Sequence, residues 1–558
     1  MKYLLKILKY SAVTLIFLIG VLTFSGVILY MSADRSLPEV SIPEFMPEPK
    51  DSSGVLLFGK SSLERGVGDL WNLRLKGSPE ERGLAFGQLC KELMYEQERA
   101  FVNQIKILVP NERYLSFLKY LTIIYNRNIQ ENIEEEFRKE IYATSLGSSD
   151  EFNYIGEPYD RQLNYHAAHD LGHAMQEYML VGCSSFAGWA SASEDSTLVI
   201  GRNFDFWVGD DFARNKLVTI MEPDRGYKFV SVGWAGMSGV LSGMNEKGLT
   251  ITMNAAKSSP PIRSKTPISI IAREILQYAS NISEAYEIAS KREAFVSESL
   301  LIGSAEENRA AIIEKTPKGT RLYNTKEDVI ISTNHFLSKE FNSDPDNKEA
   351  IDAIEGSHSK YRYIRLEELI SSKRPLSPEK SADILRDQNG ISGESLGLTN
   401  EMSINQYISH HAVVFKPVER IMWISTAPWQ LGVMVKYDLN DLFDIEGADG
   451  KRQYRDIDAD SVQIKYVFPK VQKFREMSKM ILSKSVERIE VTDDIRSNYI
   501  DLNPHFFQTY LNLGDNFFSA GNYKEANEMY IRSLEMKIPS KDIERGIKHK
   551  LDKIKRNE

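Results

Sequence analysis

The sequence predicts an α+β protein in which layered sheets are covered by helices. Short β-type runs occur in two groups, within 183–334 and within 411–437, and stretches with helical periodicity separate them. The two ends of the chain differ from this body. A long apolar segment precedes it, and a helical segment with repeat-like spacing follows it.

Composition is that of an ordinary globular protein. Apolar residues make up 42% and charged residues 26% of the 558 residues, so the chain can bury a large core. The net charge of −9 argues against nucleic acid as the main partner. Cys90 and Cys183 are the only cysteines, which excludes a disulfide framework, and a single bridge would consume both thiols.

The N-terminus predicts a membrane anchor at residues 10–31. This run has no charged side chain, and at ~1.5 Å per residue it can cross a ~30 Å hydrocarbon core. Lys2, Lys6 and Lys9 precede it and acidic residues follow, so the positive-inside rule places the N-terminus in the cytoplasm and the bulk of the chain in the periplasm. A cleaved signal peptide is the alternative, but the run is longer than the apolar core of a usual signal peptide and lacks a clear small-x-small site.

A linker and a helical segment come next. Four prolines in residues 32–67 predict a stiff, partly extended linker, and alternation from Asp69 to Leu75 predicts a strand. Ser78 and Glu81 predict a capping box that starts a helix, with Pro79 in its first turn. Helical spacing then continues to residue 145.

Three histidines share one face of a predicted helix in YHAAHDLGHAMQEYML. They are His166, His169 and His173. A metal hydrolase is one interpretation, but Asp170 stands where an HExxH motif has glutamate, and no further ligand set accompanies the histidines. We expect a polar helix face that hydrogen-bonds beside the site, with no metal and no other cofactor.

The run CSSFAGWASASEDSTLVIGRNFDF predicts two strands and a turn. An antiparallel hairpin would bring Cys183 close to Arg202 and Asp205. A cysteine thiol is mostly protonated at neutral pH, but an N-terminal cysteine carries an α-amine of pKa ~7.7–8.0 that can accept the proton. Cys183 acquires that amine only if the Gly182–Cys183 bond is cut, and Gly182 leaves room for the thiol to approach its carbonyl.

The remaining body alternates between β-type and helical runs. Strands are expected at 217–222, 228–234, 248–254, 300–303, 309–314, 328–333, 411–415, 421–426 and 431–437. Helices are expected at 267–279, 282–292, 360–371 and 378–387.

The tail has the spacing of one tetratricopeptide repeat. The residues in question are Tyr510, Leu513, Gly514, Phe517, Ala526 and Tyr530. One repeat cannot bury its own face, so we expect it to pack on the body or on a protein partner. An ordinary helical hairpin is the alternative interpretation.

Several segments, taken in order, carry a family resemblance. They are LKGSPEERGLAFGQLCKE (75–92), the cysteine followed by GRNFDF, MNEKGLTITMN (244–254), STNHF (332–336), SKYRYIR (359–365) and a strand pair at 410–430. Together they resemble the acyl-CoA:6-aminopenicillanate acyltransferase-like branch, peptidase family C45, of the N-terminal nucleophile hydrolases. That branch is related to choloylglycine hydrolase and penicillin V acylase.

The resemblance implies a four-layer αββα sandwich and a cysteine enzyme that cleaves its own chain. Its substrate would be a linear or small carbon–nitrogen amide, cleaved through an S-acyl enzyme. The implied roles are nucleophile for Cys183, thiolate stabilisation for Arg202, orientation of the freed amine for Asp205, oxyanion binding for Asn254, amine or amide binding for Asn334, and completion of the polar network for Arg362, with Arg365 as the substitute.

Two further outcomes remain open from the sequence. An amine acceptor in place of water would make the chain an N-acyltransferase, and an unprocessed chain could be a membrane-tethered scaffold. The expected segments are a basic end at 1–9, the anchor at 10–31, the linker at 32–67, a pro-segment at 68–182, the catalytic domain at 183–440, a connecting region at 441–502 and the tetratricopeptide-like tail at 503–558, the candidate site for a protein partner.

Overall fold

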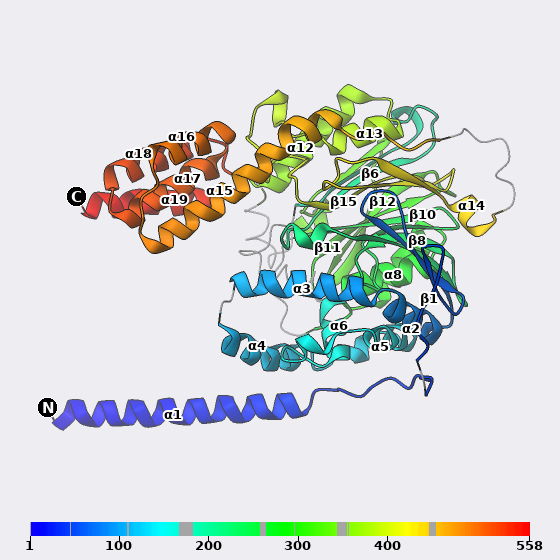
Figure 1. The fold of residues 1–558 in the computed structure, drawn as a ribbon, viewed down its shortest axis with the longest axis horizontal. Helices are drawn as coiled ribbons and strands as arrows, with labels where there is room; N and C mark the ends of the chain where they lie inside the picture. Colours follow the sequence, from blue (N-terminus) through cyan, green and yellow to red (C-terminus); the bar gives the residue numbers. More distant parts are fainter. Residues whose placement is uncertain are drawn as a thin grey trace.

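Two β-sheets with helices against them form the body of the protein, and a helical region follows at the C-terminal end (Figure 1). The predicted α+β class is therefore confirmed. The computed structural model describes residues 2–44, 46–108, 111–166, 182–256, 264–294, 296–342, 354, 356–445 and 454–557.

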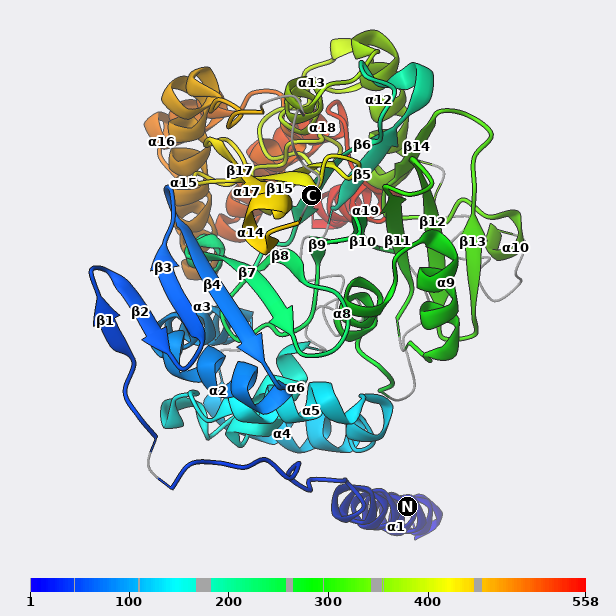
Figure 2. The same cartoon turned by 90° about the vertical axis from the view of Figure 1, so that its right-hand side faces the viewer.

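The larger sheet joins strands from both sides of Gly182. Within the described ranges its order is β1-β2-β3-β4-β7-β8-β9-β10-β11-β12-β13. The strand β4 pairs in parallel with β7, next to it in Figure 2, while the other neighbours pair antiparallel. The strands are β1 (Lys50–Ser52), β2 (Val55–Phe58), β3 (Ser61–Arg65), β4 (Leu70–Gly77), β7 (Lys216–Pro223), β8 (Phe229–Gly233), β9 (Ser242–Asn245), β10 (Leu249–Ala255), β11 (Glu298–Ser304), β12 (Arg309–Thr316) and β13 (Gly319–Tyr323).

The smaller sheet carries the predicted cysteine hairpin. Its order among the described strands is β14-β5-β6-β15-β16-β17, all antiparallel. Ser185 on β5 lies opposite Arg202 on β6, so the predicted hairpin is confirmed. The strands are β5 (Ser184–Gly188), β6 (Val199–Asp205), β14 (Val329–Ser332), β15 (Ser409–Lys416), β16 (Ile421–Ser425) and β17 (Met434–Asp438).

The helices include those predicted from periodicity. The capping box of Ser78 and Glu81 is present at the start of α2. The helices are α1 (Lys2–Met31), α2 (Pro79–Leu89), α3 (Lys91–Leu108), α4 (Glu112–Tyr125), α5 (Glu135–Ser145), α6 (Pro158–His166), α8 (Ile268–Tyr278), α9 (Ile282–Lys291), α10 (Lys339–Asn342), α12 (His358–Lys373), α13 (Pro378–Leu385), α14 (Leu439–Phe443), α15 (Phe468–Glu487), α16 (Asp493–Leu502), α17 (Phe507–Ala520), α18 (Tyr523–Leu534) and α19 (Lys541–Asn557).

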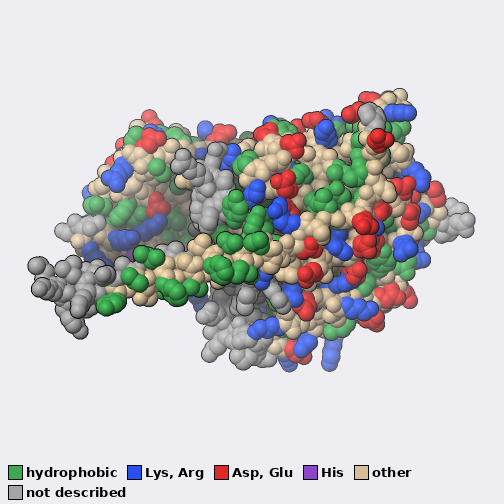
Figure 3. Space-filling view, turned by 90° about the horizontal axis from the view of Figure 1, so that it is seen from below, with side chains coloured by type: hydrophobic (Ala, Val, Ile, Leu, Met, Phe, Trp, Pro, Cys, Tyr) green, Lys and Arg blue, Asp and Glu red, His purple; other side chains and the backbone are tan. Residues whose placement is uncertain are grey.

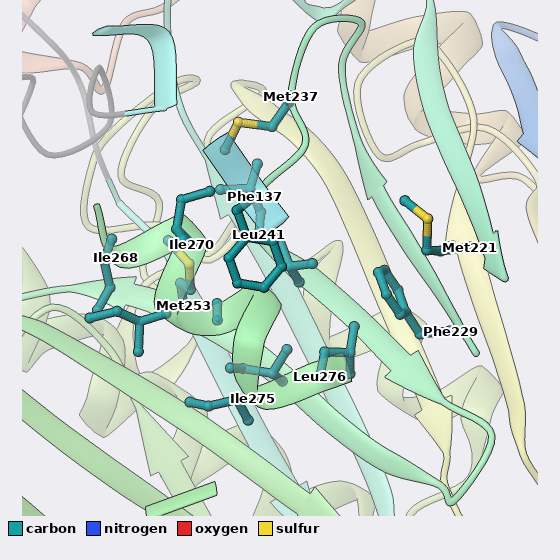
Figure 4. Close-up of a cluster of buried hydrophobic side chains, with 14 of the residues drawn as sticks. Phe137, Met221, Phe229, Met237, Leu241, Met253, Ile268, Ile270, Ile275 and Leu276 are labelled. Atoms are coloured by element: carbon teal, nitrogen blue, oxygen red, sulfur yellow. The ribbon is translucent and has the colours of Figure 1, made fainter. Parts of the chain in front are cut away.

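Three buried clusters hold the layers of the body together. One lies against the outer face of the larger sheet and includes Met253 of β10 and Leu276 of α8 (Figure 4). A second contains apolar residues of both sheets, such as Ile200 of β6 and Val218 of β7. A third joins the smaller sheet to α12 and α13. Neighbouring residues of β6 enter different clusters because side chains alternate along a strand.

The segment before Gly182 is built into this body. Residues 50–65, expected to be part of a linker, instead form the strands β1–β3 of the larger sheet. Helices α2 and α5 pack closely because Gly83 and Gly87 present bare backbone. A Cβ at Gly83 would overlap the carbonyl of Glu140, and one at Gly87 would overlap that of Thr144.

The two ends of the chain differ in burial. Val13–Met31 of α1 is long and apolar enough to span a membrane, and none of it is buried; a signal sequence meets the same criteria. Figure 3 shows its apolar side chains at the surface. At the other end, the six tail residues with repeat spacing are buried among α15–α19. The tail also contacts the body, where the Leu398 amide donates to Asn503 Oδ1 at 2.8 Å.

Candidate active site

Cys183 lies immediately before β5 and is fully buried. Its Sγ is 3.9 Å from Nη2 of Arg202 and 3.9 Å from the backbone oxygen of Asp205. Burial raises the pKa of the Cys183 thiol to about 11, although the nearby Arg202 acts in the opposite direction. The thiol is therefore protonated at neutral pH and needs a base before it can attack a carbonyl.

Arg202 is fixed by hydrogen bonds from several elements. Its Nη1 donates to the Leu241 carbonyl at 3.1 Å, and Nη2 donates to the Met253 carbonyl. Its guanidinium carbon lies 4.5 Å from the centre of the Phe204 ring. These contacts hold a permanent positive charge beside the Cys183 sulfur, where it would favour a thiolate.

Asp205 ends β6 and is also fully buried. Its Oδ1 accepts a hydrogen bond from the Ser409 hydroxyl, and its Oδ2 accepts one from Gln406 Nε2 at 3.1 Å. Burial raises the pKa of Asp205 to about 7, against the opposing effects of Ser409 and two arginines. The carboxyl group therefore changes charge near neutral pH.

The Gly182 carbonyl is held by the same glutamine. Gln406 Nε2 donates to it at 3.1 Å, while the Gly182 amide donates to the Asp205 carbonyl at 3.3 Å. A Cβ at Gly182 would overlap the Gln406 amide. The close approach between this carbonyl and its donor therefore requires glycine.

Arg362 reaches the other side of Cys183. Its Nη1 donates to the Cys183 carbonyl at 2.6 Å, and its Nη2 donates to Asn334 Oδ1 at 2.6 Å. The substitute for this role, Arg365, is engaged elsewhere, because Nε and Nη2 each donate to the Asp387 carboxylate at 3.0 Å. Of the two predicted arginines, only Arg362 contacts Cys183.

Asn254 and Asn334 lie in the surrounding network. Asn254 Nδ2 donates to Ser185 Oγ at 2.7 Å and to the Ser332 carbonyl at 2.8 Å. Its Oδ1 is buried and has no hydrogen-bond partner among the described residues. Asn334 Nδ2 donates to the Ala255 carbonyl at 2.9 Å. An oxyanion role for Asn254 would therefore require one of its two N–H groups to leave its present acceptor.

His166 is satisfied without a metal. Its Nδ1 lies 2.7 Å from the Gln162 carbonyl, and its Nε2 accepts from the Ser238 amide at 2.9 Å. Both ring nitrogens are therefore occupied, and burial lowers the pKa of His166 to about 4. His169 and His173 lie outside the described residues. Among the residues that are described, no group of three or more His, Cys, Asp or Glu has the arrangement of a metal site.

A known family model matches the central part of the body. Residues 192–427 match the family model described as "Acyl-coenzyme A:6-aminopenicillanic acid acyl-transferase". The predicted resemblance to this family is confirmed. The region matched to the acyl-transferase family begins after Cys183 and contains Arg202, Asp205, Asn254, Asn334 and Arg362.

Curated relatives match a similar share of the chain. An uncharacterized protein of Archaeoglobus fulgidus is 26% identical over 268 residues, which is 44% of either chain. Protein dcd1B of Dictyostelium discoideum is 24% identical over 266 residues, covering 45% of this chain and 51% of that protein. The chain thus spans about half the length of the curated relatives it matches.

Solved structures also match parts of the chain. A Caenorhabditis elegans ortholog of N-acylethanolamine-hydrolyzing acid amidase is 14% identical, with a TM-score of 0.31, covering 42% of this chain and 93% of that one. Penicillin V acylase from Agrobacterium tumefaciens is 16% identical, with a TM-score of 0.32, covering 46% and 86%. A variant of conjugated bile acid hydrolase from Clostridium perfringens is 12% identical, with a TM-score of 0.32, covering 49% and 97%.

Two site residues were missed by sequence reasoning. Gln406 and Ser409 come from the start of β15 and the loop before it, and both contact Asp205. The only nearby signal was the strand pair of the family resemblance, which begins at residue 410, just after both of them.

Proposed function

We propose that this chain is a cysteine N-terminal nucleophile amidohydrolase that first cleaves its own Gly182–Cys183 bond. The observation that carries the proposal is the pair of hydrogen bonds around this bond. Gln406 donates to the Gly182 carbonyl at 3.1 Å, and Arg362 donates to the Cys183 carbonyl at 2.6 Å. The confirmed family match supports the same class of reaction.

Self-cleavage begins with the Cys183 thiol. Its sulfur attacks the Gly182 carbonyl carbon, and the oxygen that gains negative charge is the one to which Gln406 donates. The thiol proton passes to the departing amide nitrogen of Cys183, and the C–N bond breaks to leave a thioester. Water then hydrolyses the thioester, which releases the Gly182 carboxylate and restores the thiol beside a new α-amine.

The processed enzyme uses the Cys183 thiol again, now on a substrate amide. The free amine of Cys183 accepts the thiol proton, and Arg202 stabilises the thiolate, whose Sγ lies 3.9 Å from its Nη2. Asp205 orients the amine and Asn334 binds the amide. Asn254 binds the oxyanion with an N–H that leaves Ser185 Oγ or the Ser332 carbonyl. The acyl group is carried on Sγ until water removes it.

The proposal also includes the layered sandwich, the membrane anchor and the repeat-like tail that the sequence predicts. The three buried clusters support an αββα sandwich, and the exposed apolar α1 supports an anchor that holds the enzyme in the periplasm. The buried repeat positions support a tetratricopeptide-like tail, with a surface left for a partner. Acyl transfer to an amine is the second candidate reaction, favoured by the description of the matching family.

The decisive experiment follows the chain on a denaturing gel and by intact mass. Purified wild-type protein in detergent is expected to give two fragments, with Cys183 as the new N-terminal residue. Cys183→Ala is expected to give one uncut chain. Cys90→Ala is the matched control, because Cys90 is equally buried but stands at the end of α2, and it should cleave like wild type.

Two results would overturn the proposal. A wild-type chain that stays whole yet hydrolyses amides would exclude self-cleavage as the route to the active enzyme. A wild-type chain that stays whole and whose Cys183 never reacts with a cysteine-directed acylating probe would exclude the nucleophile, and the scaffold alternative would then remain.

A further inference from the structure

A pocket lies where the segment before Gly182 meets the body. Its volume is about 450 Å³, including the part open to solvent. The helices α3 and α6 form one wall, and residues that follow β6 and β8 form the other. The self-cleavage chemistry uses none of these side chains, so the pocket needs an explanation of its own.

The pocket is walled by aromatic rings. They are Phe101, Tyr165, Phe206, Phe212 and Trp234. Phe212 meets Trp234 edge-on at 5.0 Å, and Phe206 stacks on Trp234 at 5.9 Å. Such a lining favours a planar apolar group, and the faces of its rings also attract a cation.

Among the polar groups of the pocket, one acceptor stands out because it has no donor. Gln162 is 3% exposed, and its Oε1 has no partner among the described residues, although its Nε2 donates to Ser148 Oγ at 3.1 Å. This oxygen lies beside Gly236, where a Cβ would be 3.1 Å from it. Glu98 also lines the pocket, and its Oε1 accepts from Arg161 Nε at 2.7 Å. A buried acceptor without a donor leaves its desolvation uncompensated, and a ligand N–H would supply the missing hydrogen bond.

The pocket adjoins the candidate active site along the chain. Phe206, one of its walls, directly follows Asp205, whose backbone oxygen is 3.9 Å from Cys183 Sγ. The Phe206 ring also lies 5.7 Å from the Phe204 ring, which Arg202 covers, so the pocket is close to the candidate site although Cys183 itself does not line it. This connection makes the pocket suitable for the non-reacting part of a substrate.

We propose that the pocket binds an aromatic group that carries a hydrogen-bond donor, above all an ammonium group. The rings hold the apolar part and attract the cation, and Gln162 Oε1 accepts the donor, while Glu98 is already paired with Arg161. This assignment rests on the proposed amidase function. The bound group is then the non-reacting end of the amide substrate, and the enzyme prefers amides of aromatic, amine-bearing compounds.

The test measures binding and needs no catalysis. Full-length Cys183→Ala protein in detergent is titrated with 2-phenylethylammonium, phenylacetate and butylammonium, and dissociation constants come from ligand-observed NMR. We expect 2-phenylethylammonium to bind at least about 5-fold more tightly than either of the others, because only it has both the ring and the cation. Adding Gln162→Leu should weaken its binding about 2- to 10-fold.

Two further variants control for folding. Gln162→Glu keeps an acceptor at this position and should retain or tighten binding. Gln508→Leu, on α17, should leave binding unchanged. Equal or tighter binding of phenylacetate, or full affinity in Gln162→Leu, would overturn the proposal. Since Cys183 is absent throughout, failure of the proposed nucleophile would leave these results unaffected.

Discussion

A single side-chain amide contacts two groups of the proposed self-cleavage reaction. Gln406 Nε2 donates at 3.1 Å both to the Gly182 carbonyl and to Asp205 Oδ2. Removing a donor from a developing oxyanion costs about 10²- to 10³-fold in rate. We expect Gln406→Leu to slow appearance of the two fragments by at least about 10²-fold, measured by gel densitometry over time.

The matched control for this variant is Gln430→Leu. Gln430 is equally buried, but its Nε2 donates to Asn405 rather than to Gly182. Cleavage in this control should proceed at close to the wild-type rate. Rapid cleavage in Gln406→Leu would show that another group stabilises the oxyanion.

The pKa of Asp205 predicts how amidase activity depends on pH. Its pKa is raised from 3.8 to about 7, mainly by burial. Both of its hydrogen-bond partners are donors, which suits the ionised carboxylate that orients the amine. We expect amidase activity of the processed enzyme to rise with pH through about 7, and Asp205→Asn to be weakly active without that rise.

The same group predicts how stability changes with pH. Below about pH 4 the carboxyl is protonated in both the folded and the unfolded protein. Between about 4 and 7 the unfolded chain has lost this proton while the folded chain keeps it, so the contribution of Asp205 to the free energy of unfolding falls as pH rises. Urea unfolding of Cys183→Ala at several pH values measures this fall, and Asp205→Asn should flatten it.

The contacts of Cys183 with Arg202 could be predicted because they are local. The sequence placed both residues on one hairpin, and strand pairing then fixes their distance. Gln406 and Ser409 could not be predicted in this way. They are more than 200 positions from Gly182 and Asp205 along the chain, and their contacts depend on how β15 is placed against β6.

At the scale of elements, α15 of the C-terminal helical region contacts the backbone next to Gln406. The guanidinium carbon of Arg475 lies 4.5 Å from the centre of the Trp207 ring, and its Nη2 donates to the Tyr407 carbonyl at 2.8 Å. Tyr407 follows Gln406 and has a φ of 56°, a left-handed value that costs a non-glycine residue ~1–3 kcal/mol. Arg475 thus helps to hold the backbone that carries Gln406.

We expect Arg475→Ala to slow self-cleavage about 10-fold or more at a temperature well below its Tm, because Gln406 would no longer be held against Gly182. Arg475→Lys should recover only part of the rate, since it cannot stack as a planar guanidinium. Arg496→Ala on α16 is the control, with its ion pair to Glu525 remote from Tyr407. A lower Tm with unchanged cleavage kinetics would mean that Arg475 is only structural.

The positions of helices and strands along the chain were predicted better than the pairing of the strands in the sheets. Periodicity located α8, α9, α12 and α13 and most strands of the body, because burial of one face imposes it locally. The strands β1–β3 were missed because they are only three to five residues long and follow a proline-rich stretch, which leaves little alternation to detect. Their membership in the larger sheet depends on pairing that no local pattern contains.

At the scale of the whole molecule, the proposed cut would fall inside one cooperative structure. Strand β4, before Gly182, pairs in parallel with β7 from Leu70↔Lys216 to Gly77↔Pro223. Glu140 of α5 is fully buried between two arginines, with Oε1 3.1 Å from Nη1 of Arg273 and Oε2 2.6 Å from Nη2 of Arg82. Burial opposes its ionisation, but the two arginines hold the pKa of Glu140 below its usual value.

These contacts predict that the two fragments remain one particle after cleavage. Wild-type protein in detergent should elute from gel filtration as a single peak containing both fragments, which separate only in denaturant. Glu140→Ala leaves two buried arginines without their carboxylate, a change that costs about 3–5 kcal/mol. It should therefore release the fragments at a clearly lower urea concentration.

Glu135→Ala tests whether the loss of any carboxylate from α5 would release the fragments at a lower urea concentration. Glu135 lies on the same helix and pairs with Lys139, but its side chain is 67% exposed. Exposed pairs contribute about 1 kcal/mol or less, so this variant should dissociate at close to the wild-type urea concentration. Separation of the wild-type fragments without denaturant would contradict this prediction. It would show that the sheet pairing and the buried ions do not hold the processed enzyme together. The segment before Gly182 would then act only before cleavage.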